Sequence, residues 1–263
     1  MLARCLQLRR GLGNPVDVAS TLTALSTAPL RAGDTGSASA AQHEALQIQR
    51  QLGHRVGEAI GLIHLGQIEI YEGNDSKARE HLEQALGIAR TLKHQEAEAV
   101  CELALGETAF EEGDQPRAYV RITRSMTVCK AAGDRRGEVT ALWWLGRLDL
   151  QGGNLEQARQ RLAEALQAFR SFEMRTDLLT CLEDHSALLS LSGACEMAVK
   201  LAAAASTLRM RLGLARSPRA EQRWLAHAAS LTQVVPSETF ATLWAEGECW
   251  ELENAMSSAL AAH

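Results

Sequence analysis

The 263-residue chain has little of what β-sheet folds need. It contains only 5 Pro and few β-branched residues, whereas Ala and Leu account for 43 and 38 positions. Because Ala and Leu are strong helix formers, this composition favours an all-helical fold and excludes a β-sandwich, a β-barrel or a parallel α/β sheet. A hydrophobic content of 46 % and a charged content of 22 % also exclude an intrinsically disordered chain.

The sequence also lacks a basic excess and a long apolar run. Its formal net charge is −5 at pH 7, whereas a protein that binds nucleic acid through the phosphates needs a basic face. No run of roughly 18 apolar residues predicts a membrane-spanning helix, and residues 1–10 lack the apolar core of a signal peptide. We therefore expect a cytoplasmic protein that does not use a membrane, with nucleic acid an improbable partner.

Patterns typical of catalytic and metal sites are missing. The 6 Cys residues are scattered without a CxxC or CxxH pair, and we interpret them as small buried side chains in a reducing compartment. The 8 His residues form no HExxH pair. Neither a GxSxG nucleophile motif nor a GxxxxGK[ST] phosphate-binding loop occurs. We predict no catalytic residue, no cofactor and no metal, and hence no enzyme.

What the chain does have is a repeat of 40 residues, visible as columns of small residues in one register. One column is glycine in five copies, Gly33, Gly73, Gly113, Gly153 and Gly193. A second column is alanine in five copies, Ala38, Ala78, Ala118, Ala158 and Ala198. A Leu-Gly pair recurs at residues 65–66, 105–106 and 145–146. Several columns in one register indicate a repeat protein.

Each repeat is predicted to be a helix, a tight turn and a second helix. The glycine column suits the position just past a helix end, where φ is often positive. The residue that follows is Asp34, Asn74, Asp114 or Asn154 in four copies, and Asp and Asn are good N-caps for the next helix. Since one hairpin cannot bury the apolar stripes of both helices, stacked hairpins are expected, which is an α-solenoid.

The register divides the chain into three parts. Residues 14–213 form five full repeats, and residues 217–263 form a helical C-terminal cap. Residues 1–13 match the second helix of a repeat whose first helix is missing. This half-repeat predicts either a fragment of a longer protein or an N-terminal capping helix. In the cap we expect helices from Pro218 to about Val234, from Pro236 to a break at Gly247, and from about Trp250 to Ala261.

The order Leu62-x-x-Leu65-Gly66, Ala78 and Ala85 resembles the tetratricopeptide repeat pattern. Residues 142–165 match it equally well, whereas His185-Ser186 replaces Leu-Gly in the last repeat and Glu102 stands where a large apolar residue is expected. The 40-residue length and the tail are similar to the C-terminal region of large bacterial signalling ATPases and LuxR-type transcription regulators. The resemblance implies a right-handed α-solenoid that serves as the sensor or interaction arm of such a regulator.

In that family the first helices of the hairpins line the concave face, which implies a set of partner-binding positions by register. These are Gln67, Ile70, Tyr71, Glu107, Phe110, Glu111, Trp143, Arg147, Gln151 and Glu183. Trp143 and Trp144 point about 100° apart on a helix. If Trp144 is buried, Trp143 faces the groove as an aromatic anchor beside Arg147; alternatively, it packs on the neighbouring repeat. A mixed-charge, partly apolar groove suits a protein or peptide.

Other functions stay open on the sequence. One is a small-molecule sensor in which a ligand changes the curvature of the solenoid and controls an effector domain outside this chain. Another is a self-association scaffold, a homodimer formed through the N-terminal half-repeat. An arginine run provides either a contact for an acidic partner, an adjacent domain or nucleic acid, or a solvated junction between the last repeat and the cap: Arg209, Arg211, Arg216, Arg219 and Arg223.

Overall fold

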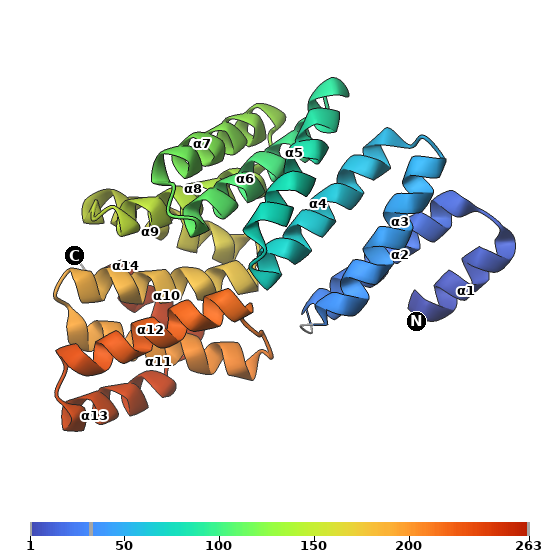
Figure 1. Ribbon diagram of the computed structural model, residues 1–263. Helices are drawn as coiled ribbons and strands as arrows, with labels where there is room; N and C mark the ends of the chain where they lie inside the picture. The colour runs from blue at the N-terminus through green and yellow to red at the C-terminus, as the bar shows by residue number, and fades with distance from the viewer. Residues whose placement is uncertain (1, 32–33, 262–263) are drawn as a thin grey trace. The chain divides into compact units, whose positions relative to one another are not determined.

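The structure is a computed structural model that describes residues 2–31 and 34–261 of the chain, and within these ranges every regular element is an α-helix. The helices fall into two compact units, Met1–Asp134 and Arg135–His263. Inside each unit, antiparallel helical hairpins stack in chain order (Figure 1). The predicted all-α solenoid fold class is therefore confirmed.

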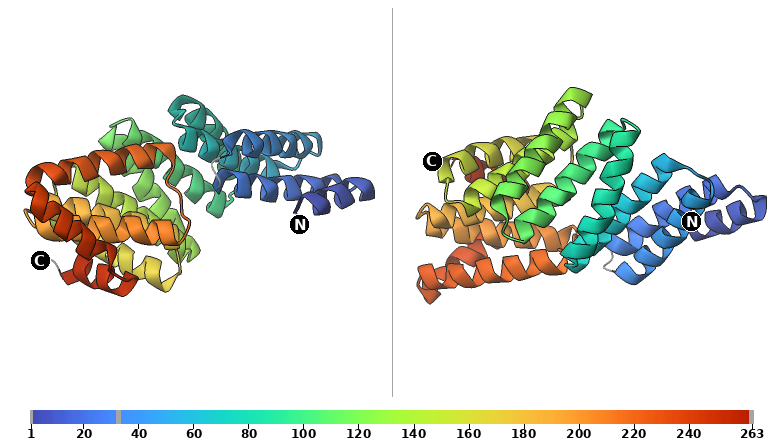
Figure 2. Two further views of the ribbon diagram at one scale, coloured as in Figure 1. Left: turned by 90° about the horizontal axis from the view of Figure 1, so that it is seen from below. Right: turned by 45° about the horizontal axis from the view of Figure 1, so that its top comes forward.

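The first unit holds the N-terminal helix and three hairpins. Its helices are α1 (Leu2–Leu12), α2 (Pro15–Arg31), α3 (Thr35–Gln51), α4 (Arg55–Glu72), α5 (Asp75–Thr91), α6 (Gln95–Glu111) and α7 (Gln115–Ala132). The pairs α2–α3, α4–α5 and α6–α7 form the hairpins, and α3–α4 and α5–α6 contacts stack one hairpin on the next (Figure 2). The α1 helix packs on α2.

The second unit holds two hairpins and three further helices. Its helices are α8 (Arg135–Gln151), α9 (Leu155–Ser171), α10 (Arg175–Leu191), α11 (Cys195–Arg211), α12 (Pro218–Val234), α13 (Ser237–Glu248) and α14 (Leu252–Ala261). The hairpins are α8–α9 and α10–α11, and of the three further helices α13 packs most extensively on α11. The α14 helix contacts α9, α10 and α11.

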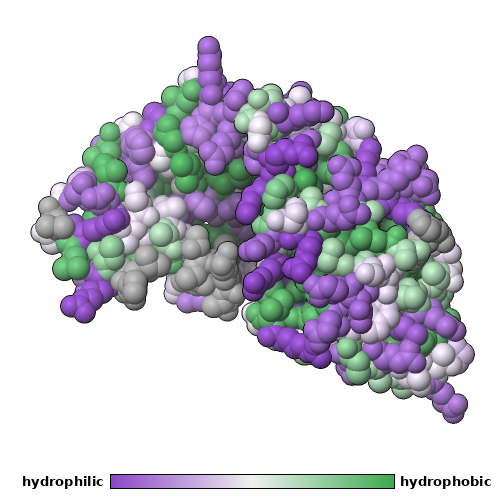
Figure 3. All heavy atoms as spheres, turned by 180° about the vertical axis from the view of Figure 1, so that it is seen from behind, coloured by the Kyte–Doolittle hydropathy of each residue, from purple (hydrophilic) through white to green (hydrophobic). Residues whose placement is uncertain are grey.

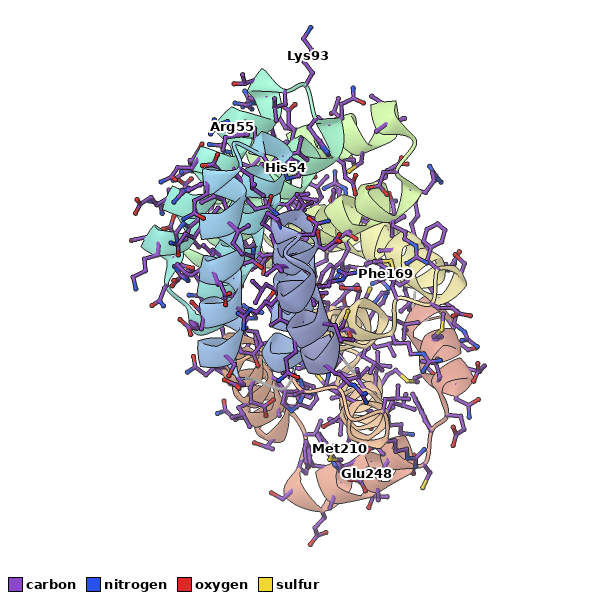
Figure 4. All side chains as sticks on the ribbon, turned by 90° about the vertical axis from the view of Figure 1, so that its right-hand side faces the viewer. His54, Arg55, Lys93, Phe169, Met210 and Glu248 are labelled. Atoms are coloured by element: carbon purple, nitrogen blue, oxygen red, sulfur yellow. The ribbon has the colours of Figure 1, made fainter. Side chains whose placement is uncertain are left out.

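The turn chemistry follows the sequence pattern. Gly113 has a φ of 79°, in the left-handed region that glycine adopts without strain. The next residue, Asp114, accepts a hydrogen bond from the backbone N–H of Arg117 and so caps α7. Between hairpins, Lys93 takes the left-handed conformation with a φ of 54°, and its side chain points away from the helices (Figure 4). The predicted turn at Gly33 lies outside the described residues.

The small-residue columns mark close contacts between the two helices of a hairpin. A Cβ on Gly66 would lie 2.6 Å from Leu82 Cγ, and one on Gly106 would lie 2.5 Å from Ile122 Cγ1. Both distances are too short for carbon atoms, so only glycine allows α4–α5 and α6–α7 to approach this closely. In the last repeat Ser186 replaces this glycine, and its Oγ donates to the backbone carbonyl of Ala198 at 2.8 Å.

The helix break predicted at Gly247 is confirmed and falls one residue later. Gly247 is the penultimate residue of α13, which runs to Glu248, and the last helix begins at Leu252. A Cβ on Gly247 would lie 2.2 Å from the backbone oxygen of Lys200 in α11. This glycine therefore allows the close contact between α13 and α11, in addition to lying next to the break that the sequence predicted.

Glu102 is fully buried where the repeat pattern calls for a large apolar side chain. Its carboxylate accepts hydrogen bonds from Arg90 of α5 and Arg121 of α7. Since a buried carboxylate needs charged or polar partners, these two arginines make Glu102 compatible with the core. The residue that departs from the pattern thus joins three helices of the first unit.

His185 occupies the leucine position of the Leu-Gly column in the last repeat and is almost completely buried. Burial lowers its pKa to about 4, although a hydrogen bond with the backbone carbonyl of Cys181 at 2.8 Å opposes the shift. The imidazole is therefore neutral in the folded chain at pH 7, and it fills the space of a leucine.

We expect His185 to make the chain sensitive to acid between pH 6.5 and about 4. In this window the unfolded histidine binds a proton that the folded one does not, so the free energy of unfolding falls as the pH falls. Urea unfolding at a series of pH values should show that His185→Leu flattens this slope by up to about 1.4 kcal/mol per pH unit. An unchanged slope in the variant would show that the buried histidine does not titrate as described.

Candidate partner-binding surface

In the first unit, one side of α4 and α6 carries a stripe of side chains that are exposed or half-buried. Ile60, Gln67 and Tyr71 of α4 are separated by seven and eleven residues, which places them on one side of the helix. Ile60 is 38 % exposed, Gln67 is exposed and Tyr71 is half-buried. The two helices contact each other, so the stripe extends from α4 onto α6.

On α6 the stripe is aromatic and acidic. Glu107, Phe110 and Glu111 are all half-buried, at the positions equivalent to Gln67, Ile70 and Tyr71 one repeat earlier. An aromatic ring beside carboxylates can accommodate an apolar side chain and a basic group of a partner together. Gln67, Tyr71, Glu107, Phe110 and Glu111 are called the α4–α6 surface below.

Two neighbours show how the α4–α6 surface is supported. His64 is partly buried, which lowers its pKa, and a side-chain hydrogen bond with Gln67 opposes that shift. Burial is the larger of the two effects, so the imidazole next to Gln67 favours its neutral form. Ile70, which was predicted to face a partner, packs instead against the core cluster that contains Leu65 and Leu105. It belongs to the floor beneath the surface.

The equivalent positions of the second unit are filled by internal packing. Trp143 and Arg147 are only 6 % and 7 % exposed. Trp143 donates from Nε1 to Asp184 Oδ2 at 2.7 Å and packs edge-on against Phe169. Of the two arrangements considered for Trp143, the structure has the one in which it packs on neighbouring helices, here α9 and α10.

Arg147 lies between the two tryptophans and Asp184. Its guanidinium is 4.3 Å from the ring centroid of Trp144 and 5.2 Å from that of Trp143. Its Nε is 3.4 Å from Asp184 Oδ1. Burial raises the pKa of Asp184, while Arg147 and the hydrogen bond from Trp143 act in the opposite direction. The arginine and tryptophan predicted to receive a partner are thus engaged with each other and with this carboxyl group.

Glu183 is likewise engaged, at the junction with the C-terminal helices. Its Oε1 accepts hydrogen bonds from Arg209 Nε at 2.9 Å and from Arg216 Nη2 at 2.9 Å. Both arginine side chains are less than 10 % exposed, so two members of the arginine run form a buried junction, where the sequence suggested a solvated one. The other predicted residue, Gln151, is exposed at the end of α8.

Hydrophilic and hydrophobic residues are interspersed over the face shown in Figure 3. Within residues 2–31 and 34–261, no helix is long and apolar enough to cross a membrane. Across the same residues, no group of three or more His, Cys, Asp or Glu side chains is placed to hold a metal ion.

These features define a class, the helical-repeat proteins built of stacked hairpins whose paired helices approach closely at a small residue, here Gly66, Gly106 or Gly146 in three hairpins. The family model described as tetratricopeptide repeat matches residues 17–91, which cover α2 to α5. The predicted resemblance to tetratricopeptide repeats is confirmed for these residues, and the remaining hairpins continue the same 40-residue register. A comparison with curated protein sequences finds no match.

Solved structures of similar fold have low sequence identity. BtubC (BKLC) from P. vanneervenii has a TM-score of 0.61 at 14 % identity, covering 95 % of this chain and 91 % of that one. A Rap protein complexed with competence and sporulation factor has a TM-score of 0.64 at 15 % identity, covering 95 % and 67 %. A signal transduction ATPase with numerous domains and a tetratricopeptide repeat sensor, from Pyrococcus horikoshii, has 0.59 at 14 %, covering 93 % and 38 %. Such identities show a shared fold alone.

Proposed function

We propose that the chain is a non-catalytic module that binds a protein or peptide segment through the α4–α6 surface. The observation that carries this proposal is the contrast between the two units. The register positions of α8 and α10 are largely taken up by Arg147–Asp184 and by Glu183 with its arginines. On α4 and α6 the same positions present Gln67, Tyr71 and Phe110 with part of their area accessible.

The composition of the α4–α6 surface favours a partner that is apolar and basic. Tyr71 and Phe110 offer rings that can be covered by an aliphatic or aromatic side chain, and aromatic residues are enriched among the energetically dominant residues of interfaces. Glu107 and Glu111 add negative charge on the same helix, consistent with the chain's net charge of −5. A Lys or Arg beside an apolar residue therefore provides the complementary motif.

We further propose that the module serves as the sensor or interaction arm of a cytoplasmic bacterial signalling or transcription regulator. Two of the structural neighbours support this context. One is a Rap protein complexed with competence and sporulation factor, and another is a signal transduction ATPase of which the matched region spans 38 %. We propose the same kind of role, sensing or interaction, for this chain.

Tyr71→Ala is expected to weaken peptide binding at least tenfold. Removal of one aromatic anchor from the centre of an interface commonly costs more than about 1.4 kcal/mol, which is tenfold in Kd. A random peptide library displayed on phage would be selected on the full chain. A fluorescein-labelled synthetic copy of the enriched peptide would then be titrated by fluorescence polarisation.

Tyr119→Ala is the matched control, because Tyr119 is 49 % exposed on α7, a second helix of its hairpin and no part of the α4–α6 surface. We expect the Kd of the Tyr119→Ala variant for the peptide to stay within twofold of that of the parent chain. Equal effects of the two substitutions, or a selection that enriches no peptide at all, would contradict the proposed function.

A further inference from the structure

A cavity of about 420 Å³ lies within the second unit, where α9 and α11 end and α10 and α14 begin. Its apolar lining includes Phe169, Leu179 and Leu208, whose side chains are 0 %, 1 % and 7 % exposed. Phe169, labelled in Figure 4, extends from α9. Cavities of roughly 300–1,000 Å³ with a mostly apolar lining and a few polar groups are typical of sites for small molecules.

Most of the charged side chains around the cavity form ion pairs with each other, and two do not. Arg170 is 2.6 Å from Glu253, and Arg211 is 3.3 Å from Glu251, so both pairs link a hairpin to the start of α14. Arg175 also lines the cavity, and its side chain has no hydrogen bond or ion pair within the described part of the chain. Glu173, at the turn before α10, is exposed and similarly unpaired there.

The repeat register shows how the last repeat differs from two earlier repeats at this point. In two earlier repeats, the arginine that begins the first helix pairs with a glutamate three residues later, as in Arg55–Glu58 and Arg135–Glu138. At the same point in the last repeat Leu178 replaces the glutamate. The substitution leaves Arg175 without its partner and places a buried leucine in the wall of the cavity.

A second change follows from the same substitution. Arg50 and Arg90 pair with Glu58 and Glu98, the glutamates of that column. Arg170 occupies the equivalent position in the last repeat, and it pairs with Glu253 of α14 instead. At this point of the last repeat, Leu178 lines an apolar cavity, Arg170 contacts α14, and the Arg175 guanidinium lies at the edge of the cavity.

We propose that this cavity binds a small zwitterion with a large apolar group, namely a free α-amino acid with an aromatic or long aliphatic side chain. The apolar group lies against Phe169, Leu178 and Leu179. The carboxylate accepts hydrogen bonds from the Arg175 guanidinium, and the ammonium group pairs with the Glu173 carboxylate. Both side chains line the same cavity and form no ion pair with each other, so the guanidinium can receive the carboxylate and the carboxylate can receive the ammonium of one amino acid.

Two further features favour this ligand over a simple cation. Arg175 is the first residue of α10, and the N-terminus of a helix carries a partial positive charge that favours a carboxylate. The paired charges Arg170–Glu253 and Arg211–Glu251 leave the surroundings close to neutral, which suits a ligand of zero net charge. The proposal uses residues other than those of the α4–α6 surface, so one can fail while the other holds.

The test compares three probes on the full chain by isothermal titration calorimetry: L-phenylalanine, 3-phenylpropionate and phenethylamine. They share the apolar ring and differ in the charged groups. We expect L-phenylalanine to bind most tightly, 3-phenylpropionate, which lacks the ammonium, to bind several-fold more weakly, and phenethylamine, which lacks the carboxylate, to bind at least tenfold more weakly. Absence of heat with L-phenylalanine, or equal binding of phenethylamine, would overturn the proposal.

Arg175→Gln separates the site from non-specific binding of the ring. The side chain is exposed and unpaired, so the variant should keep the stability of the parent chain and bind L-phenylalanine about tenfold more weakly. Arg135→Gln is the matched control, since Arg135 begins α8 at the equivalent register position and lies outside the cavity. Similar Kd values for the two variants would show that Arg175 does not bind the carboxylate.

Discussion

Trp143→Ala is expected to lower the free energy of unfolding by about 3–5 kcal/mol, the range measured for removal of a large aromatic side chain from a core. The indole is 6 % exposed and contacts the rings of Trp144 and Phe169. Its loss would leave a cavity among α8, α9 and α10. It would also remove the hydrogen bond to Asp184, leaving a buried carboxyl group with fewer partners.

This result would decide between the two arrangements considered for Trp143 from the sequence. A tryptophan that faces a groove can be removed with little change in stability, whereas a core tryptophan cannot. Urea unfolding followed by circular dichroism measures the difference. Trp244→Ala is the control in the same unit, because Trp244 is only half-buried, and it should cost less than half as much. Equal stability of the Trp143→Ala variant and the parent chain would contradict the packing described.

Gly106→Leu is expected to lower the free energy of unfolding by more than about 2 kcal/mol through overpacking. Even the first side-chain carbon would lie 2.5 Å from Ile122 Cγ1 and 3.2 Å from the backbone nitrogen of Ile122. Because Ile122 is fully buried in α7, its side chain has little room to move. The two helices of the hairpin would have to separate.

Gly87→Leu provides a control with the same chemical change in the same unit. Gly87 is exposed in the middle of α5, and a Cβ there would meet no atom within 4 Å. Since leucine has a higher helix propensity than glycine, this variant should gain up to about 1 kcal/mol. Thermal and urea unfolding of both variants tests the contact. A Gly106→Leu variant as stable as the parent chain would mean that α6 and α7 are farther apart than described.

Much of the fold could be predicted because each repeat column reflects a requirement of the local structure, such as a turn, an N-cap or a close contact between helices. A glycine followed by Asp or Asn defines a turn and an N-cap within a few residues, as at Gly113 and Asp114. The small-residue columns record the distance between paired helices. The packing role of Gly247 could not be predicted, because a glycine near the end of a helix has two possible roles, a turn or a close contact. Only the position of α11 shows that the second applies.

The candidate surface was harder to predict, since register identifies equivalent positions without showing what covers them. Trp143 and Arg147 occupy the register positions of Leu103 and Glu107. In the structure, however, both contact Asp184, which lies one repeat further along the chain. Glu183 is similarly engaged by Arg209 of α11, the second helix of the last hairpin, and by Arg216, which follows the repeats. A carboxylate and an arginine at such separations give no periodic signal. Leu178 did carry a signal, because the equivalent position of the three preceding repeats is a glutamate.

The most direct test of the central claim is to map the binding of the selected peptide by methyl NMR on chain labelled at isoleucine δ1 positions. Ile60 lies beside the α4–α6 surface, whereas Ile122 is buried between α6 and α7. The account predicts that the peptide shifts the Ile60 signal and leaves that of Ile122 in place, and that Tyr71→Ala abolishes the shift at the same peptide concentration. Binding that leaves the Ile60 signal unmoved would place the partner elsewhere and contradict the account.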